Sequence, residues 1–202
     1  MLKGLTNIFI LLLLAILSLC TQGFFWQKHY ADQTSYPRVG VLIKKRIIEA
    51  GYPPKIILRE ELIHASSMLE DFYKKRDFQP AWIGSEGPLT QVDHLINAIE
   101  EADLEGLTPD YYHLTSIKTL LREVRETRKK KTLLISEIMA DLDLLLTDAF
   151  LLLGCHFSAG CVNPTTVETK WFAKQGEVDV ASVFEEALRE NSIKESLKNL
   201  KN

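Results

Sequence analysis

The stretch of residues 141–164 constrains the fold more than any other part of the chain. Between residues 142 and 157, leucine, phenylalanine, alanine and cysteine occupy every face of a helix, so no face is suited to water. Such a helix lies in a protein core or in a membrane. Four polar residues interrupt the run: Asp141, Asp143, Thr147 and Asp148. The uninterrupted part is shorter than the roughly 20 residues that cross a bilayer. We therefore expect a buried central helix around which the other helices pack.

Shorter segments on both sides of this stretch have apolar residues at helical spacing. These patterns predict helices over residues 39–50, 60–75, 91–102, 116–125, 180–189 and 192–200, with a short helical turn over residues 108–112. No segment alternates apolar and polar residues long enough to predict a strand. The predicted fold class is all-α: a single irregular helical bundle around the buried central helix, preceded by an N-terminal signal or anchor helix.

The amino-terminal end has the pattern of an export signal. Lys3 precedes an apolar run over residues 8–19, and small or polar residues follow that run. The rest of the chain reads as one domain, which suits its length. The expected organisation is a signal peptide or membrane anchor over residues 1–23, a linker over residues 24–38 and a helical domain over residues 39–202.

The maturation of this end has three alternatives. Residues 17–20 (LSLC) have the outline of a lipoprotein box in which Cys20 is lipidated, although Leu19 is a poor fit before that cysteine. A signal peptidase could instead cut near Cys20, or the apolar run could remain as a membrane anchor. All three place the domain outside the inner membrane.

The net charge of −3 argues against one class of partner. A nucleic-acid binder is expected to be strongly basic, so we expect no nucleic acid as partner. The basic segment of residues 125–131 is expected to be a solvated loop between helices. Its functional alternative is attraction to anionic lipid or to an acidic cell-wall polymer.

Cysteine chemistry is the first candidate for catalysis. Residues 158–163 (SAGCVN) resemble the S-x-G-C-x-N/R signature around the nucleophile of the L,D-transpeptidase catalytic domain. That family places a His-Gly pair some fifteen residues upstream to activate the thiol. Here His156 lies only five residues before Cys161, and no glycine follows it. We favour Cys161 as a small residue at a helix end, with a nucleophilic thiol as the alternative.

Other arrangements of the same residues are disfavoured. Cys155, His156 and Cys161 lack the ligand spacing of a metal site, so we expect no metal and no cofactor. A disulfide between Cys155 and Cys161 is geometrically poor within one helix. Six residues rise about 9 Å, beyond the roughly 7 Å limit on the Cα separation. The bond requires Gly160 to end the helix early.

Two carboxylates of the central helix also invite a catalytic interpretation. Asp141 and Asp148 lie seven residues apart and therefore share a face. Paired acids of a glycosidase must face a cleft, whereas these would face a helical core. We favour a cap, a salt bridge or a hydrogen bond to a buried indole for each carboxylate.

Four blocks occur in the order found in a known family. Residues 72–82 (FYKKRDFQPAW) are similar to F-Y-x-x-R-x-F-x-P-A-W, residues 106–113 (GLTPDYYH) to G-L-x-P-x-D-Y-H, residues 143–150 (DLLLTDAF) to L-D-x-L-L-T-D-A-F, and residues 160–164 (GCVNP) to G-K/R-V-D/N-P. Together they resemble the N-terminal scaffold domain of the large bacterial L,D-transpeptidases, which cross-link the cell wall. The signature residues are Phe72, Tyr73, Arg76, Pro80, Trp82, Gly106, Pro109, Tyr112, His113, Asp143, Thr147, Asp148, Gly160, Pro164 and Trp171. The chain departs from the pattern at Tyr111, where aspartate is usual, and at Cys161, where a basic residue is usual.

The resemblance implies an all-α, exported, periplasmic domain that works in peptidoglycan cross-linking. In the family a peptidoglycan-binding module and a catalytic domain follow, and we expect the scaffold without them, either as a truncated transpeptidase or as a stand-alone protein. No catalytic residue carries over, because the matched blocks are structural. The implied partners are peptidoglycan or a separately encoded L,D-transpeptidase. The alternatives are acyl transfer by Cys161 and a stand-alone envelope interaction protein. Within the fold, we predict that Arg76 pairs with Asp148.

Overall fold

The computed structural model of the protein describes residues 36–127, 132–159 and 178–201. The α-helices of these parts are α2 (Tyr36–Glu49), α3 (Ser66–Lys75), α4 (Gln91–Glu101), α5 (Leu114–Thr127), α6 (Thr132–Ala159), α8 (Val180–Glu190) and α9 (Ile193–Asn199). Two 3-10 turns, η1 (Ala102–Glu105) and η2 (Pro109–Tyr112), lie between α4 and α5. Two short antiparallel pairs are formed by β1 (Ile57–Leu58) with β2 (Glu61–Leu62) and by β3 (Ile83–Gly84) with β4 (Gly87–Pro88). The predicted all-α class is confirmed.

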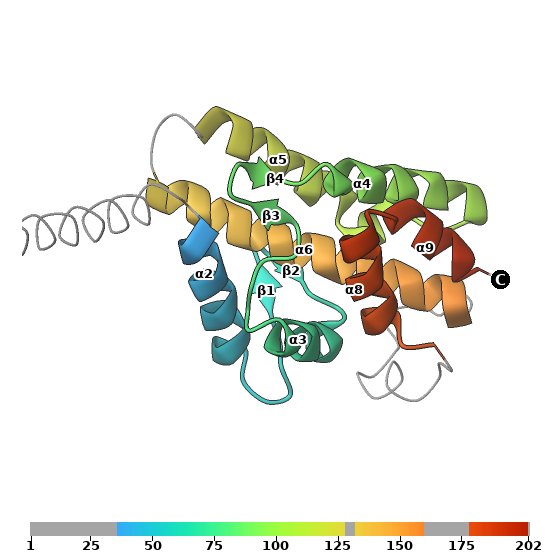
Figure 1. Ribbon diagram of the computed structural model, residues 1–202, viewed down its shortest axis with the longest axis horizontal. Coiled ribbons are helices and arrows are strands. Elements are labelled where there is room, and N and C mark those ends of the chain that lie inside the picture. The colour runs from blue at the N-terminus through green and yellow to red at the C-terminus, as the bar shows by residue number, and fades with distance from the viewer. Residues whose placement is uncertain (1–35, 128–131, 160–177, 202) are drawn as a thin grey trace, which may run out of the picture.

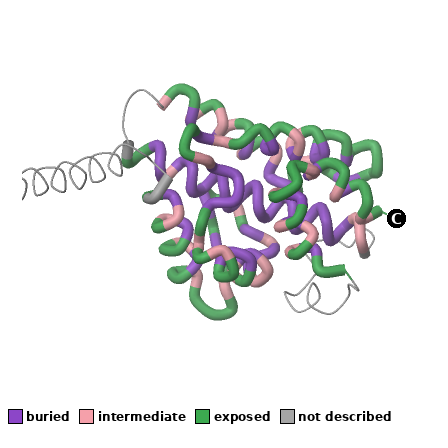
Figure 2. Tube along the Cα trace, viewed as in Figure 1, coloured by how far each residue is buried: buried purple, intermediate pink, exposed green. Residues whose placement is uncertain are grey.

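Helix α6 forms the centre of the domain. It runs lengthwise through the molecule, with α2 and α3 on one side, α4 and α5 on the other, and α8 and α9 against its carboxyl-terminal half (Figure 1). Every residue from 138 to 156 is buried (Figure 2). Because this stretch has no polar face, burial on all sides stabilises it, by roughly 1.5–3 kcal/mol for each large apolar side chain. The prediction of a buried central helix is confirmed.

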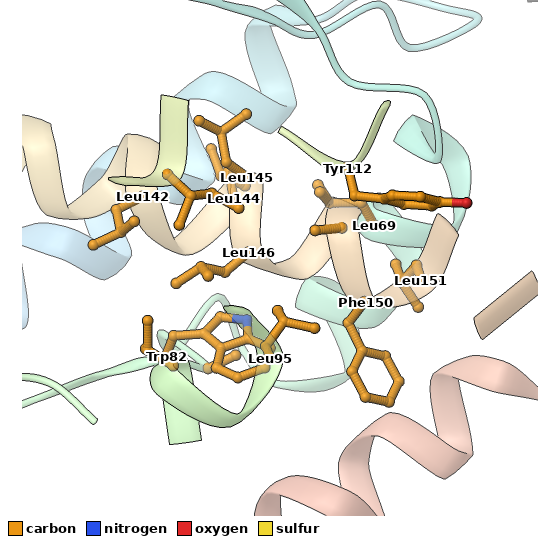
Figure 3. Close-up of a cluster of buried hydrophobic side chains, with 14 of the residues drawn as sticks. Leu69, Trp82, Leu95, Tyr112, Leu142, Leu144, Leu145, Leu146, Phe150 and Leu151 are labelled. Carbon is orange, nitrogen blue, oxygen red and sulfur yellow. The ribbon is translucent and has the colours of Figure 1, made fainter. Parts of the chain in front are cut away.

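The neighbouring helices each bury one apolar stripe against this centre. Their stripes follow the helical spacing of the sequence: Val39, Ile43 and Ile47 in α2; Val92, Leu95 and Ile99 in α4; Ile117, Leu120 and Val124 in α5. Figure 3 shows Leu95 and the indole of Trp82 against the leucines of α6. These helices therefore pack as amphipathic elements around an apolar one.

Aromatic rings join α8 to this core. The ring of Phe184 in α8 stacks on Phe72 of α3 with centroids 4.6 Å apart and on Phe150 of α6 at 4.4 Å. Its centroid lies 5.2 Å from that of Trp82. All four rings are fully buried or nearly so, and stacked rings at such distances add to the free energy gained from their buried area.

The hairpin of β1 and β2 corrects the prediction of a helix over residues 60–75. The helix begins only at Ser66, since Leu58 pairs with Glu61 in the hairpin. Arg59 and Glu60 form its two-residue turn with φ values of 48° and 75°. Both angles are positive, as in the turns that join hairpin strands, but such turns normally carry asparagine, aspartate or glycine. The sequence therefore lacked the usual signal.

Several predicted segments lie outside the described residues. They are the signal or anchor over residues 1–23, most of the linker over residues 24–38, and the basic residues 128–131. The last three residues of the predicted linker, residues 36–38, belong to α2. Within the described parts of the chain, no helix is both long enough and apolar enough to cross a membrane.

Candidate functional site

Three polar side chains of α6, Asp143, Thr147 and Asp148, form what we call the polar hub. Asp143 and Thr147 lie one helical turn apart, and Asp148 follows directly. All three are fully buried in the apolar centre of the domain. A buried carboxylate is costly unless hydrogen bonds or an opposite charge satisfy it. The partners of the hub therefore decide what these residues do.

Asp143 binds the segment that follows α3. One carboxylate oxygen accepts hydrogen bonds from the hydroxyl of Tyr73 at 2.5 Å and the backbone N–H of Ala81 at 3.0 Å. The other oxygen accepts from the backbone N–H of Trp82 at 2.8 Å. Burial raises the pKa of Asp143, and these hydrogen bonds oppose the rise. Since every partner is a donor, the side chain acts purely as an acceptor.

Thr147 continues this network. Its hydroxyl accepts a hydrogen bond from the indole N–H of Trp82 at 3.1 Å and lies 2.8 Å from the hydroxyl of Tyr73. Because the Tyr73 proton is directed at Asp143, Thr147 donates its own proton to Tyr73. The resulting chain runs from Trp82 through Thr147 and Tyr73 to Asp143. It fixes both aromatic side chains of the first sequence block on α6.

Asp148 binds two further segments. One carboxylate oxygen accepts from the backbone N–H of Ala65 at 2.7 Å. The other accepts from the backbone N–H of His64 at 3.1 Å and from Nε2 of His113 at 2.8 Å. His64 and Ala65 precede α3, whereas His113 lies at the corner between η2 and α5. A single carboxylate thus joins both segments to the central helix.

His113 lies between two carboxylates. Its Nδ1 binds Glu61, whose other oxygen accepts a hydrogen bond from the hydroxyl of Ser116. Burial lowers the pKa of His113, but the hydrogen bonds and charges of Asp148 and Glu61 outweigh burial and raise that pKa to about 9. Both ring nitrogens therefore carry protons at neutral pH. The buried imidazolium neutralises part of the negative charge that surrounds it.

These contacts place three of the four sequence blocks around one turn of α6. The hub comes from the third block, Tyr73 and Trp82 from the first, and His113 from the second. A family model described as "Scaffold domain" matches residues 67–202, which is more than half of the chain. The chain belongs to this scaffold-domain family. The resemblance to the scaffold domain of the L,D-transpeptidases is thereby confirmed, and the chain has a scaffold role in that context. No curated protein and no solved structure matches the chain.

Arg76 of the scaffold domain does not pair with Asp148, so that prediction is wrong. Its Nη1 lies 2.6 Å from a carboxylate oxygen of Glu185 in α8. Its other nitrogens donate to the carbonyls of Gln79 and Pro80 at 3.3 and 3.1 Å. Arg76 therefore closes the turn after α3 and links it to α8.

Asp141 and Asp148 are not a catalytic pair in the scaffold domain. Asp141 binds Arg46 of α2 at 2.9 Å and Arg59 of the hairpin turn at 3.0 Å. Asp148 binds His113 instead. The expected salt bridges are confirmed for both carboxylates, whereas the buried indole of Trp82 donates to Thr147.

The remaining signature residues have structural positions. Gly106 ends η1 with a φ of 76°, and Pro109 lies in the first turn of η2. The hydroxyl of Tyr112 lies 2.6 Å from Nδ1 of His156 at the carboxyl-terminal end of α6. Gly106 has a left-handed conformation, which glycine adopts at no steric cost.

Cys155 is a buried packing residue. Its sulfur lies 4.0 Å from the sulfur of Met68, and burial raises the pKa of its thiol to about 12. A thiol with so high a pKa is a poor nucleophile at neutral pH. Within the described residues, no group of three histidine, cysteine, aspartate or glutamate side chains could hold a metal ion.

Several predicted positions lie outside the described residues. They are Cys20, Gly160, Cys161, Pro164 and Trp171. The nucleophilic role of Cys161, its disulfide with Cys155 and the lipidation of Cys20 therefore stay predictions.

Proposed function

We propose that the scaffold domain is a non-catalytic component of an L,D-transpeptidase system that works in peptidoglycan cross-linking outside the inner membrane. The observation that supports this role most is that the side chains of the polar hub bind other groups of the same chain. Asp143, Thr147 and Asp148 bind Tyr73, Trp82, His113 and backbone N–H groups of their own chain. These family residues hold the domain together, which suits a part that positions another molecule.

The hub also supplies the rigidity that positioning requires. Two segments outside the helices, around Ala65 and Ala81, are fixed to the central helix. Their backbone N–H groups donate hydrogen bonds to the buried carboxylates of Asp148 and Asp143. Buried hydrogen bonds to charged groups contribute about 1.5–3 kcal/mol each. A surface built on these segments keeps its shape when a catalytic domain or a glycan strand binds. Peptidoglycan and a separately encoded L,D-transpeptidase are the partners that we propose.

The proposal is tested by removing the gene and analysing the cell-wall fragments by chromatography and mass spectrometry. We expect fewer cross-linked fragments, and we expect wild-type protein and Cys161→Ser to restore them equally. Asp148→Ala, which breaks the hub, should restore them poorly. An unchanged set of fragments after gene removal contradicts the role in the cell wall.

A separate measurement addresses the alternative of acyl transfer by Cys161. A carbapenem acylates a working transpeptidase thiol, and the adduct is detected by intact mass. We expect no adduct on the purified protein. An adduct that disappears in Cys161→Ser, together with failure of that variant in the cell, would establish an enzyme instead.

A further inference from the structure

The outer face of α2 is the feature that the proposed function leaves unused. Val41 and Ile48 lie seven residues apart on this face and are 67% and 64% exposed. The opposite face of α2 is buried against α6 through its own apolar stripe. Val41 and Ile48 are therefore apolar side chains of α2 that do not pack into the core. Exposed apolar side chains that stand singly are common on protein surfaces, so these two are informative only together with the charges around them.

Basic residues surround these two side chains. Arg38, Lys44 and Lys45 are exposed on the same side of α2, and Glu49 is the exposed acid near its end. The nitrogen of Lys44 lies 5.1 Å from the ring centroid of Phe78, and Lys44 is an exposed residue. The whole chain carries a net charge of −3, so this face differs in sign from the protein as a whole. A positive face with embedded apolar residues is typical of a helix that lies on an anionic bilayer.

The composition of the face favours a lipid over a protein as the partner. The centre of a protein–protein interface is depleted of charge, and lysine is especially rare there. Here Lys44 and Lys45 lie between Val41 and Ile48 along the helix. Such an arrangement lets the apolar groups enter the headgroup region while the ammonium groups remain near phosphate.

The position of α2 in the chain supports the same partner. The apolar run of residues 8–19 ends shortly before α2, and 16 residues, 20–35, connect the two. At roughly 3.5 Å per residue, this connection is at most about 60 Å long. Tyr52, just beyond the helix, is 99% exposed, and tyrosine is enriched where membrane meets water.

We propose that the outer face of α2, defined by Val41, Lys44, Lys45 and Ile48, lies on the surface of a bilayer that contains anionic lipid. The cations bind lipid phosphate, and the two apolar side chains enter the headgroup layer. This contact orients the scaffold domain, with α8 and α9 at the opposite end of the molecule from α2 (Figure 1). The surface is separate from the polar hub.

The test measures binding of the full chain to vesicles by co-sedimentation. Vesicles of phosphatidylcholine alone are compared with vesicles that also contain phosphatidylglycerol. The apolar run of residues 8–19 is present in every variant and can bind both kinds of vesicle. The quantity compared between variants is therefore the gain in affinity when phosphatidylglycerol is added. We expect Lys44→Glu with Lys45→Glu to reduce this gain by at least about tenfold.

The matched control is Lys194→Glu with Lys198→Glu, which makes the same charge change on exposed residues of α9. It should keep most of the gain in affinity. In a third variant, Val41→Ser with Ile48→Ser, binding to the anionic vesicles should also weaken. Circular dichroism verifies that each variant is folded. Equal losses in the α2 and α9 variants, or no gain on anionic vesicles with wild-type protein, would overturn the proposal.

Discussion

Nε2 of His113 donates a hydrogen bond to a carboxylate oxygen of Asp148 across 2.8 Å, and both side chains are buried in the centre of the domain. His113 has a left-handed backbone conformation, with φ of 59°, which few residues adopt without cost. The contact ties the corner between η2 and α5 to α6. Since Glu61 binds the other ring nitrogen, the hairpin is tied to the same point.

The stability of the domain should fall as pH rises from 6.5 to 9. The pKa of His113 in the folded chain is about 9, above its ordinary value of 6.5, because of Asp148 and Glu61. A raised pKa means that folding favours the protonated form, so this contribution is complete below pH 6.5 and lost above pH 9. A difference of this size between the two pKa values corresponds to about 3 kcal/mol. Urea unfolding at several pH values measures it.

The control for this prediction is His113→Asn, because asparagine tolerates the left-handed backbone. The variant should be less stable at pH 6.5 and show a much flatter dependence up to pH 9. A wild-type protein with constant stability in this window, or a variant with the same fall, would contradict a buried imidazolium at His113.

Asp143→Asn should destabilise the domain by about 3 kcal/mol, although the two side chains have the same shape. Both oxygens of Asp143 accept from Tyr73, Ala81 and Trp82. An amide places an NH₂ group against at least one of these donors. Asp71→Asn, on the exposed side of α3, is the matched control and should change stability by less than about 0.5 kcal/mol. Comparable losses in both variants would show that the acceptor geometry is unimportant.

A double-mutant cycle distinguishes the two possible partners of Arg76. Because Arg76 and Glu185 are 2.6 Å apart and partly exposed, substituting both by alanine should reveal a coupling of about 1 kcal/mol in denaturant unfolding. The same cycle with Asp148 in place of Glu185 should be additive. Strong coupling of Arg76 to Asp148 would support the pairing that the sequence suggested.

Gly154→Ala should be destabilising even though alanine has the higher helix propensity. A Cβ atom at this position would lie 2.6 Å from Cγ1 of Val180 and 3.2 Å from Cδ1 of Leu200. Overpacking costs about 1–3 kcal/mol, more than the gain of about 1 kcal/mol in propensity. In thermal unfolding, Val180→Ala should recover part of the loss when combined with Gly154→Ala. No recovery would place the strain elsewhere.

The central helix and the sequence blocks could be predicted because their signals are local. An apolar stretch without a polar face identifies a core helix, and Asp143, Thr147 and Asp148 stand out within it. The partners of these residues could not be predicted, because they depend on how distant segments pack. The turn at Arg59 and Glu60 has no glycine or asparagine, so the hairpin that supplies Glu61 resembled a helix. Likewise, nothing local indicates that Glu185 of α8 reaches Arg76.

Native-state hydrogen exchange of four backbone amides tests the role of the polar hub most directly. The amides of His64, Ala65, Ala81 and Trp82 lie outside helices and donate to Asp143 or Asp148. If the hub holds the scaffold domain together, they exchange as slowly as the core of α6 and only through global unfolding. Exchange as fast as that of the exposed loop around Tyr52 would contradict the account.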